Sequence, residues 1–192
     1  MVREWSRNFM FSDVRSKKII LVSHCILNQN SISDGTADYP STNENVLKLL
    51  IQSKVGIIQM PCPEMICLGL DRGDIHGGER EVVVENTRIR HNLENPTSIE
   101  VINNLANQII FQIEEYIQNG FIVLGIIGIN RSPSCGVNTT SKNNQEVYGE
   151  GIFIEILREA LEKKSISIDM IGIKASETDK ALISIQRLID TH

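Results

Sequence analysis

The chain has 192 residues, of which 41% are hydrophobic and 22% are charged, and this composition excludes a disordered or fibrous protein. Its 24 acidic residues outnumber its 19 basic residues, so we expect no nucleic-acid partner, because nonspecific affinity for nucleic acid comes mostly from basic side chains. No apolar run approaches the roughly 20 residues of a membrane span, so we also expect no membrane segment and a cytoplasmic location.

The first third of the chain contains two apolar runs separated by polar sequence. Residues 1–17 lack the apolar core of a signal peptide and are predicted to be an N-terminal extension. The apolar residues of this extension are expected to pack on the domain or on a partner chain: Trp5, Phe9, Met10 and Phe11. A strand is predicted at 18–23, a helix at 42–53 after a polar stretch, and a second strand at 55–60.

The rest of the chain continues the alternation after an irregular stretch. Residues 68–95 hold four glycines and many charges, with a short strand-like piece at 81–85. Such a long irregular stretch in a compact domain is typical of a functional lid, so we expect it to cover the binding crevice. The remaining pattern predicts a helix at 96–119, a strand at 121–129, a loop at 138–148, a helix at 150–163, a strand at 166–174 and a helix at 180–191.

This alternation of strands and helices predicts an α/β fold. We expect a single domain at 18–192, with the irregular insertion at 68–95, built as a Rossmann-like or flavodoxin-like three-layer sandwich. Its mostly parallel sheet of about four strands would carry helices on both faces. Open sheets of this kind bind ligands beyond the carboxyl ends of their strands, where the strand order reverses.

Three of the four cysteines follow predicted strands. Cys25, Cys62 and Cys135 come shortly after the first, second and third strands, so their thiols are expected to converge at one sheet edge. The alternatives are buried core thiols, a reactive thiol or metal ligands, because disulfides are unlikely to persist in a reducing compartment. The spacings of 37 and 73 residues match no zinc finger, whereas an iron–sulfur cluster accepts thiolates from distant parts of a chain.

Cys67 leaves the ligand number open. It lies five residues after Cys62 and is a fourth ligand, a buried neighbour or a thiol that shuttles sulfur. With three protein ligands, a four-iron cluster keeps one iron open, and an open iron is a Lewis acid that favours sulfur donors. We expect Cys67 not to be a ligand.

Three short motifs resemble those of the thiouracil desulfurase family. They are His24-Cys25-Ile26-Leu27-Asn28, Pro61-Cys62-Pro63-Glu64 and Ser132-Pro133-Ser134-Cys135-Gly136. The resemblance runs from about residue 19 to residue 173. Two departures, at Asn28 and in the 68–95 segment, indicate a divergent branch of the family, so the resemblance implies a thiolated substrate without identifying it as thiouracil.

The resemblance implies both a cofactor and a reaction. The implied cofactor is a [4Fe–4S] cluster held by Cys25, Cys62 and Cys135, and the implied reaction is non-redox hydrolytic removal of sulfur from a small thiolated, thioamide- or thiouracil-like compound. By position, Glu64 and Ser132 are the expected acid/base residues, with Ser134 as the second choice. The simpler alternatives are that Glu64 satisfies backbone N–H groups at a helix start and that the serines only shape a turn.

Two other functional classes remain alternatives. One is a non-catalytic cluster or metal-binding protein, such as a sulfur carrier, a sensor or an electron-transfer module. The other is a thiol-based redox enzyme without metal. The small thiolated substrate is the expected partner, and the oligomeric state is left open, with a homodimer among the alternatives.

Overall fold

Four apolar strands form one parallel sheet. The computed structural model describes residues 11–191 and contains β1 (Lys18–Val22), β2 (Gly56–Gln59), β3 (Ile122–Ile129) and β6 (Met170–Ile173) in the order β2-β1-β3-β6. Each neighbouring pair is parallel: Ile20 lies opposite Ile57, and Ile127 lies opposite Ile171. The predicted α/β class and the sheet of about four parallel strands are confirmed.

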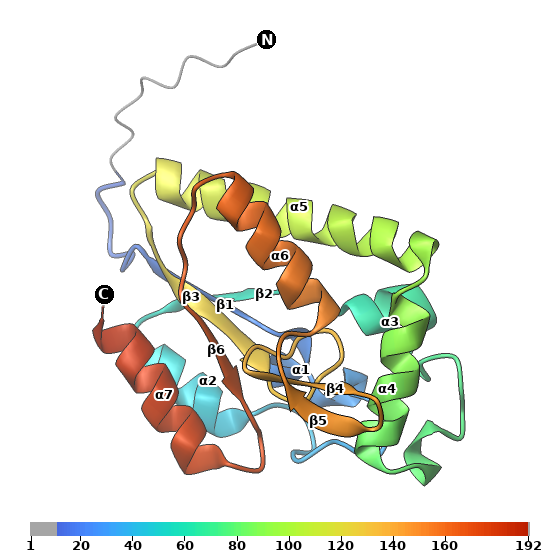
Figure 1. Ribbon diagram of the computed structural model, residues 1–192. Coiled ribbons are helices and arrows are strands. Elements are labelled where there is room, and N and C mark those ends of the chain that lie inside the picture. Colours follow the sequence, from blue (N-terminus) through green and yellow to red (C-terminus); the bar gives the residue numbers. More distant parts are fainter. Residues whose placement is uncertain (1–10, 192) are drawn as a thin grey trace.

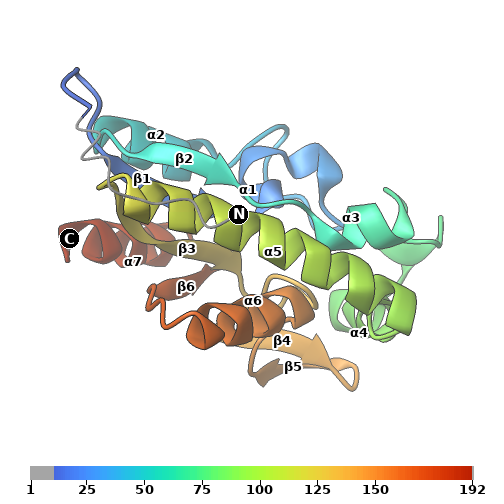
Figure 2. The same cartoon turned by 90° about the horizontal axis from the view of Figure 1, so that it is seen from above.

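Helices cover both faces of this sheet (Figures 1 and 2). On one face, α5 (Pro96–Gln118) and α6 (Ile152–Lys163) form a core with Leu21 and Ile126. On the other face, α2 (Glu44–Gln52) and α7 (Thr178–Asp190) enclose a second core with Ile20 and Leu124. Successive residues of a strand point to opposite faces, so β1 contributes to both cores. The result is the expected three-layer sandwich.

The remaining elements gather beyond the carboxyl ends of the strands (Figure 1). They are α1 (His24–Leu27), η1 (Gln29–Ser31), α3 (Pro63–Leu68), η2 (Gly77–Glu79), α4 (Val82–Leu93) and the hairpin of β4 (Thr139–Lys142) and β5 (Gln145–Tyr148). The order of the strands reverses between β1 and β3, because the chain passes from β1 to β2 on one side and later places β3 on the other. This switch point is where a fold of this type places its ligand.

Three predicted elements differ from the structure. The prediction of a strand-like piece at 81–85 was wrong. These residues are Glu81, the N-cap of α4, and the first residues of that helix. Ile89 and Leu93 of α4 are fully buried, and their packing outweighs the strand preference of the three valines that begin it. Residues 138–148, predicted as a loop, form the β4–β5 hairpin instead, and the last strand is shorter than predicted.

The opposite edge of the sheet holds the beginning of the described chain. Phe11 packs edge-to-face on Phe121 with a centroid distance of 5.5 Å, and the Arg15 guanidinium lies 3.8 Å from the centre of the Phe11 ring. Trp5, Phe9 and Met10 lie outside the described residues. The division into an extension at 1–17 and one domain at 18–192 stays a prediction. Within residues 11–191, no helix is long and apolar enough to cross a membrane.

Candidate functional site

Three thiols meet at the switch point of the sheet. Cys25 lies in α1 directly after β1, Cys62 is the N-cap of α3 after β2, and Cys135 follows β3. All three side chains line one cavity at the carboxyl edge. The structure therefore brings together the three cysteines that the sequence selects.

Burial keeps these thiols protonated. It raises the pKa of Cys25 well above its ordinary value, and the neighbouring Cys135 and Cys62 thiols act in the same direction. Burial, with a smaller contribution from Glu64, raises the pKa of Cys62 to about 11, and burial followed by Cys62 raises that of Cys135 to about 12. Ionising them together requires a positively charged group among them, as metal binding provides.

Cys67 is separated from this group. Its thiol lies 3.9 Å from the backbone carbonyl of Ser98 and packs against the core between the sheet and α5. It is not among the residues that line the cavity. This position matches the buried-neighbour alternative for Cys67.

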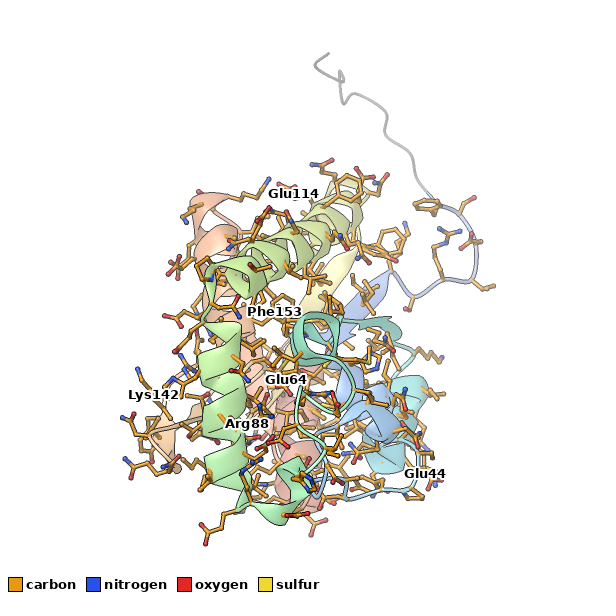
Figure 3. All side chains as sticks on the ribbon, turned by 90° about the vertical axis from the view of Figure 1, so that its right-hand side faces the viewer. Glu44, Glu64, Arg88, Glu114, Lys142 and Phe153 are labelled. Carbon is orange, nitrogen blue, oxygen red and sulfur yellow. The ribbon has the colours of Figure 1, made fainter. Side chains whose placement is uncertain are left out.

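The Glu64 carboxylate is the centre of the polar contacts beside the thiols. One oxygen accepts hydrogen bonds from Ser134 Oγ at 2.6 Å and Ser132 Oγ at 3.3 Å. The other accepts from Arg72 Nε at 3.1 Å and Ser33 Oγ at 3.3 Å. Glu64 is only 6% exposed, and Figure 3 shows it beside α4, the helix that carries Arg88. The three predicted acid/base candidates thus form one connected network in the cavity wall.

Arg72 belongs to the charged part of the 68–95 segment, which on sequence alone is either solvated or supplies polar contacts to the crevice. In the structure it is 2% exposed and lines the cavity, whereas Asp71 and Asp74 do not. Its Nη2 donates to the Ser31 carbonyl at 2.5 Å and lies 3.8 Å from Cys62 Sγ, which adds to its bond with Glu64. The nearby positive charge of Arg72 lowers the pKa of Cys62, although burial outweighs this effect.

The turn that carries Cys135 is organised by Ser132. Its Oγ accepts the backbone N–H groups of Cys135 at 3.0 Å and Ser134 at 3.3 Å, besides donating to Glu64. The turn-shaping alternative is therefore present for Ser132 together with its contact to the carboxylate. Ser134 is 1% exposed, and its Oγ lies 3.5 Å from Cys135 Sγ.

The segment 68–95 covers the same edge of the sheet, as expected. Arg72, Val82 and Asn86 contribute to the cavity wall, and Asn86 Nδ2 donates to the Arg131 carbonyl at 3.2 Å. Arg88 Nη2 donates to the Arg72 carbonyl at 2.9 Å and so ties α4 to the residues that follow α3. The cavity is therefore walled by this segment as well as by the three cysteine loops.

Two buried polar atoms at this site have no partner. Within residues 11–191, the unpartnered buried side-chain nitrogen and oxygen atoms are Ser23 Oγ and His24 Nε2. Both belong to residues that directly precede Cys25. The same described range contains no group of three or more His, Cys, Asp or Glu side chains that could hold a single metal ion. The cavity is thus lined by soft thiols from three loops, and the residues before Cys25 carry two polar atoms without a partner.

Comparison with known proteins gives one family and two similar proteins. The family model described as 2-thiouracil desulfurase matches residues 20–167. An uncharacterised protein of Methanocaldococcus jannaschii is 30% identical over 178 residues, which cover 92% of this chain and 99% of that protein. A solved structure described as a [4Fe–4S]-dependent thiouracil desulfidase has a TM-score of 0.45 and 16% identity, covering 88% of this chain and 99% of that one.

Proposed function

The chain belongs to the 2-thiouracil desulfurase family, and from this premise we propose that it is a desulfidase acting on a small thiolated compound by hydrolysis. In that reaction water adds to the carbon of a C=S group, a C=O group replaces it, and sulfur leaves as hydrogen sulfide. No electrons are gained or lost. The observation that carries the proposal is the shared cavity wall of three thiols and the Glu64 network.

We infer that Cys25, Cys62 and Cys135 hold a [4Fe–4S] cluster and that Cys67 is not a ligand. The donor set fits, because soft thiols arrive from three separate loops and the two residues before Cys25 each have a buried polar atom without a partner. Each thiolate binds a different iron in such a cluster, so the three sulfur atoms need not converge on a single ion. When bound, this group supplies an open iron that binds and polarises the sulfur of the substrate.

The chain's own residues would handle the protons. Glu64 is placed to accept a proton from the attacking water, because its carboxylate lies in the cavity wall beside Cys62. Ser134 donates to the same carboxylate oxygen at 2.6 Å and can pass a proton between that oxygen and the departing sulfur. Ser132 holds both groups in place through its contacts with Glu64 and the Cys135 backbone.

The alternative of a metal-free thiol redox enzyme is disfavoured by the electrostatics. Reactive cysteines in such enzymes have lowered pKa values, because the thiolate is the nucleophile. Here burial raises the pKa of Cys62 to about 11 and that of Cys135 to about 12. A simple sulfur carrier or electron-transfer protein has no need for a buried carboxylate that contacts two serine hydroxyls beside its cofactor.

The decisive experiment is anaerobic reconstitution with iron and sulfide, followed by measurement of bound iron, acid-labile sulfide and sulfide released from 2-thiouracil. We expect about four irons per chain and substrate-dependent sulfide release. Cys25→Ser, Cys62→Ser and Cys135→Ser should lose the iron, and Cys67→Ser is the matched control that should keep it. Retention of iron in Cys25→Ser with loss in Cys67→Ser would contradict the ligand assignment.

A chain that binds iron but releases no sulfide from 2-thiouracil, 4-thiouracil or simple thioamides would contradict the desulfidase proposal and favour the carrier alternative. The cytoplasmic location and the lack of a nucleic-acid partner stay predictions. Sedimentation of the reconstituted protein would test whether it is a homodimer.

A further inference from the structure

The backbone groups of Ser23 are hydrogen-bonded, but its side-chain hydroxyl is not. Its N–H donates to the Ile127 carbonyl at 2.9 Å, and its own carbonyl accepts from Ile26 at 3.0 Å. The residue is 0% exposed, yet Oγ has no hydrogen-bond partner. The hydroxyl is close enough to the Cys135 thiol to lower its pKa, but it makes no hydrogen bond of normal geometry with that sulfur. A buried hydroxyl without a partner is destabilising unless a bound group accepts a hydrogen bond from it.

His24 presents a second unused donor. Its Nδ1 lies 2.7 Å from Gln59 Nε2, and an amide nitrogen can only donate, so Nδ1 is the acceptor. The neutral ring therefore carries its proton on Nε2, the atom that is buried without a partner. His24 lines the same cavity as Cys25.

We infer that Ser23 Oγ and His24 Nε2 are hydrogen-bond donors to sulfur atoms of the group bound between Cys25, Cys62 and Cys135. This inference rests on the proposed function, which identifies that group as an iron–sulfur cluster. Thiolate and sulfide sulfurs accept hydrogen bonds, and donors around a cluster stabilise its negative charge and raise its reduction potential. Two adjacent residues before Cys25 would thus tune the cofactor without ligating it.

The two states of the protein give opposite expectations for Ser23→Ala. In the apoprotein the substitution removes an unpaired buried hydroxyl, so the urea midpoint of unfolding should rise. In the iron-loaded protein it removes a hydrogen bond, so the reduction potential should fall and iron loss to a chelator should be about 10-fold faster. The matched control is Ser98→Ala, a buried serine whose Oγ accepts from Asn95 Nδ2 at 2.9 Å, and it should lower the stability of both states.

His24 is tested by His24→Phe and His24→Gln in the loaded protein. Loss of the donor in His24→Phe should lower the reduction potential. His24→Gln keeps an N–H group, so its reduction potential should lie between those of His24→Phe and the wild type. Far-ultraviolet circular dichroism of each apoprotein checks that the fold is retained.

The outcomes separate this inference from the proposed function. If the wild-type chain binds no iron, the proposed function fails and this inference fails with it. If the wild type is loaded but Ser23→Ala and His24→Phe leave its potential and its iron loss unchanged, this inference alone is overturned. A fall in apoprotein stability for Ser23→Ala, like that of Ser98→Ala, would also overturn it, because the hydroxyl would then have a partner already.

Discussion

Arg72 and Glu64 form an ion pair from which solvent is almost excluded. Nε and Oε2 are 3.1 Å apart, and the two side chains are 3% and 8% exposed. The remaining guanidinium hydrogens of Arg72 reach the carbonyls of Gly69, Leu70 and Ser31 and the Cys62 thiol. One buried cation therefore connects the acid/base candidate with a proposed cluster ligand and with η1.

Removing only one member of this pair should be costly. Arg72→Met leaves Glu64 buried without its cation, so we expect the apoprotein to lose about 3–5 kcal/mol of unfolding free energy in urea denaturation. The double variant Arg72→Met/Glu64→Met buries no unpaired charge and should recover part of that loss. Strictly additive losses in this double-mutant cycle would show that the two side chains do not interact.

Glu64→Gln should separate chemistry from cofactor binding. The amide keeps the shape of the carboxylate and an oxygen that accepts from the serines, but it cannot take a proton from water. The amide also leaves Arg72 without its anion and should lower the stability, so iron is measured per folded chain, where we expect unchanged content and a sulfide-release rate lower by about 10²–10⁴-fold. Ser134→Ala should behave similarly. Ser132→Ala should also reduce iron content, because Ser132 Oγ accepts the Cys135 backbone N–H. Full turnover in Glu64→Gln would remove Glu64 from the proposed mechanism.

A glycine beside the Cys135 turn should be needed for cofactor uptake. A Cβ at Gly151 would lie 2.4 Å from the Ser134 carbonyl carbon and 2.9 Å from the Cys135 nitrogen, so Gly151→Ala must displace this turn. We expect lower iron content after reconstitution, with the helical circular dichroism retained. Gly56→Ala is the control, since its added methyl would make only ordinary contacts at 3.4 Å. Equal iron content in both variants would contradict this prediction.

Protonation of Glu85, in the first turn of α4, should lower the stability of the protein in acid. Hydrogen bonding to Arg88 is the largest effect that lowers the pKa of Glu85, and Arg80 adds to it. The ion pairs of Glu85 therefore stabilise the fold at pH values above the pKa of a glutamate in the unfolded chain. This contribution is lost as the pH falls through the lower pKa that Glu85 has in the folded state. Glu85→Gln should cost on the order of 1 kcal/mol at pH 7 and progressively less below pH 4 in urea titrations. A stability difference between the wild type and Glu85→Gln that does not change with pH would contradict this prediction.

The order of strands and helices follows from the sequence because buried parallel strands are apolar along their whole length. The hairpin at 139–148 was missed because its strands are polar, although Thr140 and Ser141 of β4 are buried and only β5 is mostly exposed. The pair Asn143-Asn144 was nevertheless a signal in the sequence, because asparagine tolerates positive φ angles. Both residues adopt such angles in the structure, as a two-residue hairpin turn requires. The three valines that begin α4 favour a strand locally, and only their tertiary surroundings make them helical.

The site was predictable where its residues stand next to strand ends or within short motifs. Cys25, Cys62 and Cys135 are examples of the first kind, and Glu64 and Ser134 of the second. Ser33 and Arg72 carry no such signal, because each lies in a polar irregular stretch and reaches Glu64 only through folding. The same is true of Ser23, whose lack of a partner is visible only once its neighbours are in place.

The pairing of β1 with β3 also bears on the time at which the site becomes complete. Lys18 of β1 lies beside Ile122 of β3, so this contact cannot form until most of the chain has left the ribosome. Cys25 and Cys62 emerge earlier, when the sheet still lacks β3 and the turn that carries Cys135. Maturation of the proposed cofactor should therefore follow synthesis, at a pace governed by closure of this long-range pairing. Iron delivered to the nascent chain would find only part of its binding site.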